Sequence, residues 1–266
     1  MSTVILIPAR HASSRYPAKP LATLRQPDGS SKTLIRMSWE AACRVRGVDE
    51  VWVATDHEDI RAEAESFGAR VVMTSSDCEN GTARCAEALR NMGRDFDLVI
   101  NFQGDAPLTP PWFVEALIDA MKADPSVGMA TPVLRCDRET WENFREDRRH
   151  GRVGGTTAVF DNSMNALYFS KEVIPFADPD KVGDVIPVFH HVGVYAYRPE
   201  ALAAYEAAGV GSLETLEGLE QLRFLQNGLP IRCVEVEGRG RVFWELNNPV
   251  DVARIETVLA TQGEAK

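Results

Sequence analysis

The residues Thr3-Val-Ile-Leu-Ile7 and the loop that follows them, Pro8-Ala-Arg-His-Ala-Ser-Ser-Arg-Tyr-Pro-Ala-Lys-Pro20, decide the fold. A short and almost continuously apolar run is typical of a strand that is buried on both faces of a parallel sheet. Three more runs of this kind follow in the first 101 residues: Glu50–Ala54 (EVWVA), Ala69–Met73 (ARVVM) and Asp97–Asn101 (DLVIN). The first part of the chain therefore predicts four parallel strands.

The segments between these runs have the period of helices. Ile60, Ala64 and Phe67 recur at i, i+4 and i+7, and a second set recurs at i, i+3, i+4 and i+7, which predicts helices with one buried face. The second set is Cys85, Ala88, Leu89 and Met92. Alternating strands and helices predict the α/β class, with a mostly parallel central sheet flanked by helices.

The second half of the chain, after about residue 124, changes character. It predicts a hairpin around Asp161-Asn162 and a smaller lobe of antiparallel strands. The expected strands are Gly128–Leu134, Thr156–Phe160, Ala166–Phe169, Val192–Tyr197 and Ile231–Val236, the expected helices are Glu200–Ala208, Glu214–Leu225 and Pro249–Leu259, and Arg138–Arg152 is expected to be a polar connection. We predict one domain, residues 1–266, with functional halves of about 1–124 and 125–266.

Composition and charge exclude several classes of protein. The 266 residues carry a formal charge of −10, which argues against a general nucleic-acid binder because such proteins present a basic surface to phosphates. No window approaches the length of apolar sequence that a membrane helix needs, and the N-terminus lacks the pattern of a signal peptide. The five cysteines form no CxxC pair, so a reducing cytoplasm is the expected location.

The loop after the first strand is rich in cations. Arg10, Arg15 and Lys19 follow the carboxyl end of that strand, where open α/β sheets bind ligands. Two guanidinium groups and a mobile ammonium suit a chain of phosphates, although a basic loop with solvated charges is the alternative. The loop has neither the GxxxxGK[ST] pattern of a P-loop nor the GxGxxG pattern of a dinucleotide site, which argues against an NAD-dependent enzyme.

A set of motifs along the chain resembles one family. The first loop reads IPAR-x-x-S-x-R-x-P-x-KPL, and the other motifs are VATDHEDI (Val53–Ile60), VVMT (Val71–Thr74), NGTAR (Asn80–Arg84), NFQGDAP (Asn101–Pro107), ALYFS (Ala166–Ser170), HVGVYAYR (His191–Arg198) and LEGLEQLR (Leu216–Arg223). In this order they resemble the 3-deoxy-manno-octulosonate (Kdo) cytidylyltransferases, also called CMP-Kdo synthetases. Sialic-acid cytidylyltransferases share only the general form of the first loop.

The resemblance implies a Rossmann-like nucleotidyltransferase fold and a transferase activity. The implied enzyme transfers a cytidylyl group from CTP to the anomeric hydroxyl of a 2-keto-3-deoxy sugar acid, most simply Kdo, and releases pyrophosphate for lipopolysaccharide or capsule synthesis. It also implies Mg²⁺ as cofactor and a homodimer in the cytoplasm, with no nucleic-acid partner and no insertion into a membrane.

The resemblance also assigns site residues. The implied catalytic residues are Arg10, Lys19 and Asp105, and Asp105 stands at the position of the family's magnesium ligand. The implied nucleotide-binding residues are Ala9, Arg10, Ser13, Arg15, Lys19, Asn80, Gly81, Arg84 and Gln103. The implied sugar-acid residues are Gln103, His191, Tyr195, Glu220 and Gln221. Because neighbouring strand residues face opposite ways, at most one of His190 and His191 is expected to face a pocket.

Some of these residues also have plainer interpretations. Asp105 follows Gly104 and is also consistent with a turn cap, and Asp56 is interpreted at least as readily as the N-cap of the helix after it, with Asp59 in the first turn. A glutamate-bearing helix such as the segment around Glu220 is most often just a solvated face.

Three positions depart from the family pattern. Asn247 stands where the family commonly has a second magnesium-binding Asp, and an amide oxygen still coordinates Mg²⁺ but without charge. Ala106 replaces a usual Glu beside the first metal ligand, and Thr157 replaces a usual Lys. These changes favour altered metal or sugar-acid recognition. The alternatives are therefore the same chemistry on an amino-substituted Kdo or a related nonulosonate, or a member that binds without turnover.

Overall fold

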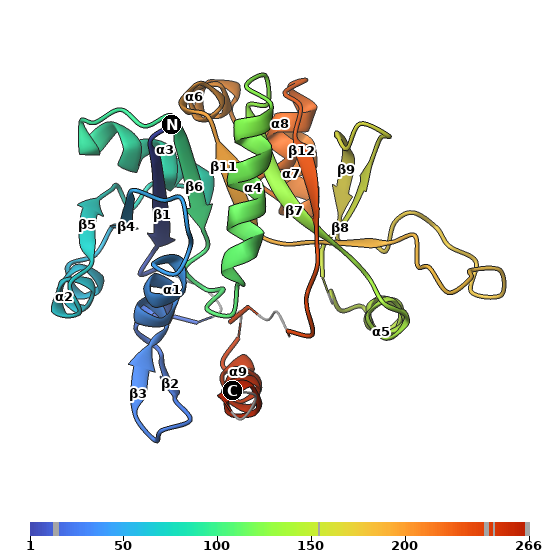
Figure 1. Cartoon of the computed structure of the whole chain (residues 1–266), viewed down its shortest axis with the longest axis horizontal. Coiled ribbons are helices and arrows are strands. Elements are labelled where there is room, and N and C mark those ends of the chain that lie inside the picture. Colours follow the sequence, from blue (N-terminus) through green and yellow to red (C-terminus); the bar gives the residue numbers. More distant parts are fainter. Residues whose placement is uncertain (13–15, 154, 242–244, 247, 264–266) are drawn as a thin grey trace. The chain divides into compact units, whose positions relative to one another are not determined.

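The computed structural model of the chain describes residues 1–12, 16–153, 155–241, 245–246 and 248–263 (Figure 1). The chain divides into two compact units, which we describe separately. Unit 1 comprises Met1–Glu115 together with Gly238–Lys266, and unit 2 comprises Ala116–Glu237. The C-terminal segment is thus part of the same unit as the N-terminal strand, whereas the sequence-based halves place it with the second half. No helix in the described part of the chain is both long and apolar enough to cross a bilayer.

A parallel sheet forms the centre of unit 1. Its strands are β1 (Thr3–Ala9), β4 (Glu50–Thr55), β5 (Arg70–Met73) and β6 (Leu98–Phe102). They lie side by side in the order β5-β4-β1-β6, and every neighbouring pair is parallel (Figure 1). Val4, Ile5, Leu6 and Ile7 of β1 are fully buried. The four predicted strands are confirmed, and burial on both faces explains why the sequences of β1 and β6 are mostly apolar without alternation.

Unit 1 also contains helices. They are α1 (Leu34–Ala42), α2 (Glu58–Ser66), α3 (Gly81–Met92), the start of α4 (Pro111–Ala123) and the C-terminal α9 (Asp251–Gly263), and a short hairpin is made by β2 (Thr23–Arg25) and β3 (Ser31–Thr33). The predicted buried faces are confirmed for Ile60 and Ala64 of α2 and for Cys85 and Ala88 of α3. Ile255 of α9 packs with residues of β2 and α1, which joins the end of the chain to the core of unit 1.

The sheet of unit 2 is mainly antiparallel. Its strands are β7 (Met129–Arg135), β8 (Thr157–Phe160), β9 (Ala166–Ser170), β10 (Phe189–His191), β11 (Val194–Tyr197) and β12 (Arg232–Val236). Strand β7 pairs antiparallel with β10 and β11, and β8 and β9 form the predicted hairpin. Only β12, among the described strands of this unit, pairs in parallel, and it does so with β7. The predicted antiparallel lobe is confirmed, and with it the α/β class.

Two predictions about helices in unit 2 are wrong. The expected polar connection is helix α5 (Arg138–Arg149), which begins at the N-cap Asp137 and buries Trp141 and Phe144. The expected helix Glu214–Leu225 is divided into α7 (Ser212–Glu217) and α8 (Leu222–Gln226). Gly218 ends α7 in the left-handed conformation, φ 61°, which glycine adopts at little cost. The remaining helix, α6 (Pro199–Ala208), matches its prediction.

Candidate functional site

The loop after β1 presents its polar groups at the carboxyl edge of the unit 1 sheet. Ala9 ends β1 and is buried, whereas Arg10 directly after it is exposed. Ala18 adopts a left-handed conformation, φ 52°, and Lys19 follows it at the start of a short 3-10 turn, Lys19–Leu21. Ser13 and Arg15, which were also assigned to the nucleotide, lie outside the described residues. The loop thus keeps Arg10 and Lys19 at the edge where ligands of parallel sheets bind.

Lys19 and Asp105 form an ion pair. Nζ of Lys19 lies 2.6 Å from Oδ2 of Asp105, and the side chains are 16% and 24% exposed. The backbone carbonyl of Asp105 accepts a hydrogen bond from the amide of Leu246 at 2.8 Å, so the C-terminal segment of unit 1 also reaches this point. Two of the three predicted catalytic residues, 86 positions apart in the chain, therefore meet directly.

The close approach of β1 and the segment after β6 depends on Gly104. A Cβ atom at this position would lie 2.8 Å from the backbone oxygen of Pro8. The carbonyl of Gly104 also accepts a hydrogen bond from Oγ of Ser38 at 2.9 Å, which ties the loop to α1. A Cβ atom would collide with backbone, which cannot move aside as the end of a side chain can. The ion pair of the next residue, Asp105, with Lys19 therefore requires glycine at position 104.

We expect Gly104→Ala to lower the free energy of unfolding by about 1–3 kcal/mol, because the added methyl group overpacks two backbone segments. Urea unfolding measures this change. Gly29→Ala is not a matched control because Gly29 has a positive φ, so Gly183→Ala, where no atom lies within 4 Å of the added Cβ, serves as the comparison. An unchanged midpoint for Gly104→Ala would show that the loop relaxes freely and that the close approach is not needed.

Asn80, Gly81 and Gln103 come together at the start of α3. Oδ1 of Asn80 accepts a hydrogen bond from the amide of Ala83 at 2.9 Å and so caps the helix. A Cβ atom on Gly81 would lie 3.0 Å from Nε2 of Gln103 and 3.4 Å from Nδ2 of Asn101. The side chain of Gln103 therefore lies against the helix N-terminus, and three residues assigned to the nucleotide share one place at the carboxyl edge of β6.

Arg84 is buried rather than exposed to a ligand-binding surface. Its guanidinium donates to Oγ1 of Thr74 at 2.5 Å and pairs with Oδ2 of Asp56 at 3.1 Å, and both charged side chains are less than a tenth exposed. The other oxygen of Asp56 accepts from the amide of His11 at 3.1 Å. The assignment of Arg84 to the nucleotide stays a prediction, and the contacts show that Arg84 supports the loop after β1 through Asp56.

The interpretation of Asp56 as a helix cap is wrong. Helix α2 begins at Glu58, and its N-cap is His57, whose Nδ1 accepts from the amide of Asp59 at 3.2 Å. Asp56 turns instead toward Arg84, since a buried guanidinium needs a charged partner more than an exposed helix end needs a cap.

We expect Asp56→Asn to lower the free energy of unfolding by about 3 kcal/mol, because it leaves the buried Arg84 without a compensating charge. Urea denaturation at pH 7 measures the loss. Glu65→Gln breaks an ion pair with Arg61 on the exposed face of α2 and is the matched control, with little change expected. Equal midpoints for the two variants would contradict a supporting role for the buried pair.

His11 and His57 stack face to face, with ring centroids 3.8 Å apart and an angle of 15° between the planes. Together with Asp59 they place three potential ligand atoms within 4.8 Å of one another. Ring nitrogens hold their lone pairs in the ring plane, so two nearly parallel rings do not direct them at one ion. A nitrogen-rich group is also a poor match for Mg²⁺, which prefers oxygen ligands.

The carboxylate of Asp105 offers the oxygen donors that Mg²⁺ prefers. Its carboxylate follows a parallel strand and lies beside a cation-bearing loop, and one carboxylate combined with substrate phosphates is a donor set that this ion commonly uses. The residues present therefore fit the ion. Asn247, the other assigned ligand, lies outside the described residues.

The residues assigned to the sugar acid are in unit 2. His191 is 6% exposed, and its Nε2 lies 2.9 Å from Oγ1 of Thr131. The hydroxyl of Tyr195 donates to Oε1 of Gln221 at 3.2 Å, and the His191 and Tyr195 rings are 5.6 Å apart. Nε2 of Gln221 is buried with no hydrogen-bond partner among the described residues. Glu220 is half-buried and directly precedes Gln221.

The two neighbouring histidines face opposite sides of β10, as the alternation of a strand predicts. His190 packs edge-on against Phe144, at 5.1 Å between centroids, while His191 contacts Phe169. Burial lowers the pKa of His190 to about 4 and that of His191 to about 3. Both rings are therefore uncharged near neutral pH, and the contact of His191 with Thr131 is a hydrogen bond between neutral groups.

Thr157, which occupies the position of the family's usual lysine, binds the backbone of the segment after β9. Its hydroxyl donates to the carbonyl of Glu172 at 2.6 Å and accepts from the amide of Ile174 at 3.1 Å. The side chain is fully buried. A lysine at this point would have to bury its ammonium or displace the segment after β9.

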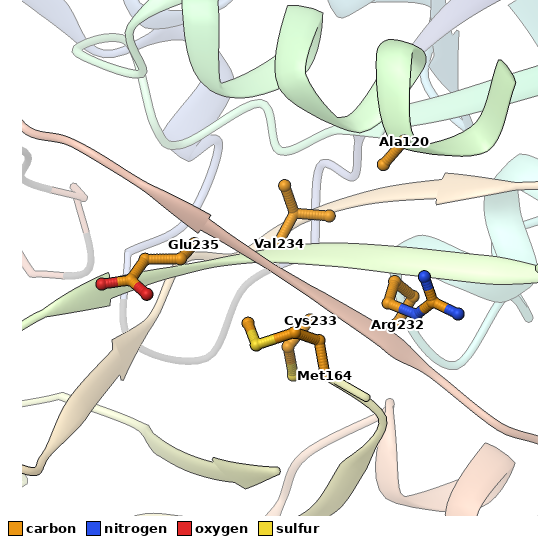
Figure 2. Close-up of a pocket in the computed structure, with 6 residues that line it drawn as sticks. All are labelled: Ala120, Met164, Arg232, Cys233, Val234 and Glu235. Carbon is orange, nitrogen blue, oxygen red and sulfur yellow. The ribbon is translucent and has the colours of Figure 1, made fainter. Parts of the chain in front are cut away.

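A cavity of about 330 Å³ lies elsewhere in unit 2, and Figure 2 shows its lining residues. Ala120 of α4, Met164 and four residues of β12 surround it: Arg232, Cys233, Val234 and Glu235. The charged groups at its rim already have partners, since Arg232 pairs with Asp124 and Glu235 with Arg135. None of the residues assigned to the nucleotide or the sugar acid lines this cavity.

The sequence assigned no role to Thr131 or Asn101, which lie beside His191 and Gly81. Thr131 and Asn101 lie in strands and are fully buried, and both amide atoms of Asn101 lack hydrogen-bond partners among the described residues. Asp56 was interpreted at least as readily as a helix cap. Thr131 and Asn101 could both have been noticed in the sequence as polar residues inside apolar strands. Burying such a side chain costs free energy unless it forms a hydrogen bond.

Comparisons with known proteins show to which family the chain belongs. A family model described as "Cytidylyltransferase" matches residues 4–233. The chain is 43% identical over 264 residues to a 3-deoxy-manno-octulosonate cytidylyltransferase from Maricaulis maris (strain MCS10), with 99% of each chain covered. It is 38% identical over 262 residues to an 8-amino-3,8-dideoxy-manno-octulosonate cytidylyltransferase from Shewanella sp. (strain W3-18-1), covering 98% of this chain and 99% of that one.

Solved structures show the same fold. A CMP:2-keto-3-deoxy-manno-octonic acid synthetase complexed with CTP matches with a TM-score of 0.83 and 32% identity, covering 98% of this chain and 100% of that one. A 4-diphosphocytidyl-2C-methyl-D-erythritol synthase from Anaerococcus prevotii DSM 20548 matches with a TM-score of 0.59 at 12% identity, covering 97% and 96%, and this likeness concerns the fold alone. The family match over most of the chain, together with these relatives, shows that the chain belongs to the cytidylyltransferases.

Proposed function

We propose that this cytidylyltransferase transfers the cytidylyl group of CTP to the anomeric hydroxyl of Kdo, giving CMP-Kdo and pyrophosphate. The observation that carries the proposal is the Lys19–Asp105 pair at the carboxyl ends of β1 and β6, in a chain 43% identical to a Kdo cytidylyltransferase. In this reaction the anomeric oxygen forms a bond to the α-phosphorus, and the bond between that phosphorus and the oxygen bridging to the β-phosphate breaks. The proton of the hydroxyl passes to solvent.

The residues of unit 1 supply alignment and charge. We assign the triphosphate to Arg10 and Lys19, with Arg15 and Ser13 in the same loop, because the leaving pyrophosphate gains charge as the bond breaks. We assign Mg²⁺ to Asp105 and Asn247. When bound, the ion neutralises phosphate charge and polarises the α-phosphate.

The Lys19–Asp105 ion pair holds both side chains at the proposed CTP site before the substrate binds. The short distance between them keeps the ammonium and the carboxylate ordered before CTP arrives. With CTP bound, Lys19 would donate hydrogen bonds to phosphate oxygens, and Asp105 would then be free to hold Mg²⁺. Ala9, Asn80, Gly81, Arg84 and Gln103 are proposed to bind or position the nucleoside.

Unit 2 is proposed to bind the sugar acid. His191, Tyr195, Glu220 and Gln221 offer neutral and anionic hydrogen-bonding groups that suit the hydroxyls of such a sugar. The buried amide nitrogen of Gln221 in particular lacks a partner among the described residues, so a bound acceptor oxygen would satisfy it.

A second candidate acceptor is 8-amino-3,8-dideoxy-manno-octulosonate, since relatives that act on it are 38–40% identical over most of this chain. We also propose that the product serves lipopolysaccharide or capsule synthesis and that the enzyme works in the cytoplasm. A homodimer is proposed through unit 2, where Leu167 on β9, Phe176 and Val185 are 62%, 88% and 70% exposed.

An acceptor panel tests the proposed function. Pyrophosphate release is measured with CTP and each of Kdo, the 8-amino sugar and a nonulosonate, with and without Mg²⁺, and with UTP in place of CTP. We expect the highest kcat/KM with CTP and Kdo, and only in the presence of Mg²⁺. A preference for the 8-amino sugar would favour the second candidate, and CTP binding without release for any acceptor would show a member that binds without turnover.

A further inference from the structure

The hydroxyl of Thr131 lies within hydrogen-bond distance of three polar atoms but has one proton to donate. Oγ1 lies 2.9 Å from the carbonyl oxygen of Val194, 3.3 Å from that of Val192 and 2.9 Å from Nε2 of His191. Thr131 and His191 are both buried, so these contacts are not exchanged with water. A threonine hydroxyl has one proton to donate and two lone pairs with which to accept.

The identities of the neighbours fix where the proton lies. The two carbonyl oxygens have no proton to give, so the hydroxyl donates to one of them, and the shorter and better choice is Val194. With its proton directed at Val194, Oγ1 can only accept a hydrogen bond from Nε2 of His191. Because burial keeps the imidazole uncharged, one ring nitrogen carries the only N–H, and the contact with Oγ1 requires that it be Nε2.

We propose that Thr131 is a positioning residue that holds His191 as the Nε2–H tautomer, so that Nδ1 accepts a hydrogen bond from a hydroxyl of the sugar acid. No described residue occupies Nδ1 with a hydrogen bond. An acceptor at this point favours a hydroxyl and disfavours the carboxylate of the same substrate, since two acceptors repel. The part that concerns the sugar acid rests on the proposed function, whereas the tautomer does not.

Next to the acceptor Nδ1 of His191, Tyr195 and Gln221 provide a hydrogen-bond donor. The Tyr195 hydroxyl donates to Oε1 of Gln221, which leaves the amide nitrogen as a donor without a partner among the described residues. His191 and Tyr195 are in ring contact, so unit 2 offers an acceptor and a donor within one small group of residues. Such a set recognises a substrate that carries both a hydroxyl and a carboxylate.

The tautomer is tested by ¹⁵N NMR of the histidine side chains, because the protonated and unprotonated nitrogens of a neutral imidazole resonate in separate ranges. The wild-type protein at pH 7 is expected to show His191 with a protonated Nε2 and an unprotonated Nδ1. Thr131→Val removes the acceptor and should mix the two tautomers, while Thr131→Ser should restore the wild-type pattern. An Nδ1–H tautomer in the wild type overturns the proposal, whatever the activity of the enzyme.

Kinetics test the role toward the substrate. We expect Thr131→Val to raise KM for the sugar acid by about three- to tenfold and to leave KM for CTP unchanged, with Thr131→Ser close to wild type. Thr3→Val is the matched control, since Thr3 is equally buried but its hydroxyl has no partner among the described residues. An unchanged KM for the sugar acid in a Thr131→Val protein whose tautomers are mixed overturns the substrate role and leaves the proposed function intact. If Thr131→Val does not fold, the wild-type spectrum and Thr131→Ser still decide the tautomer.

Discussion

Replacing Lys19 by alanine is expected to reduce kcat for pyrophosphate release by about 10²- to 10³-fold, the size of effect seen when one preorganised charge-stabilising group is removed from a transition state. Lys19 lies at the carboxyl edge of the parallel sheet and is already ordered by Asp105 at 2.6 Å. Its loss leaves the charge on the departing pyrophosphate without that ammonium. Initial rates at saturating CTP and sugar acid measure the change.

Lys32→Ala is the matched control for this variant. Lys32 also pairs with a carboxylate at 2.6 Å, that of Glu40, and is similarly part-buried, but it lies on the β2–β3 hairpin rather than at the strand ends. Both variants should unfold at nearly the wild-type urea concentration, because part-exposed ion pairs contribute little to stability. A folded Lys19→Ala protein with wild-type kcat would contradict the role assigned to Lys19.

Replacing Asp105 by asparagine is expected to lower kcat/KM by at least about 10²-fold and to move the Mg²⁺ dependence to higher concentrations. The change keeps the shape of the side chain and removes the charge that a hard cation needs. It also leaves Lys19 without its carboxylate partner, so the loop after β1 should be less well ordered before CTP binds.

The Mg²⁺ titration separates these two effects. Saturating Mg²⁺ should restore part of the activity if Asp105 holds the ion, and should restore none if the residue serves only to order Lys19. Glu40→Gln, which breaks the control ion pair, should change neither kcat nor the Mg²⁺ dependence. A wild-type Mg²⁺ dependence in Asp105→Asn would show that the ion is held elsewhere.

Most of the fold was predictable because burial leaves a direct trace in the sequence. Strands β1 and β6 are buried along almost their whole length, and β4 is buried in its second half, so their sequences are mostly apolar. Helix α5 was missed because it buries only Trp141 and Phe144 and is otherwise polar. The division between α7 and α8 was missed because Gly218 interrupts an apolar pattern that continues on both sides.

The site was predictable only in part, for a similar reason. Lys19 and Asp105 each follow a parallel strand, and strand ends at one edge of a sheet meet in space. That the two side chains would pair was not visible, since it depends on the register of β1 and β6 and on the close approach at Gly104. The pairing of Asp56 with Arg84 could not be predicted either. An aspartate directly before a helix is expected both when it caps the helix and when it forms a buried ion pair.

The reaction itself is the central claim, and identification of its product tests that claim most directly. The purified chain is incubated with CTP, Kdo and Mg²⁺, and the product is analysed by ³¹P NMR and mass spectrometry. The proposed function predicts one equivalent of pyrophosphate for each molecule in which a single phosphodiester joins CMP to the anomeric oxygen of the sugar acid. Release of pyrophosphate with free CMP and no sugar nucleotide, or no consumption of CTP with any sugar acid, would contradict it.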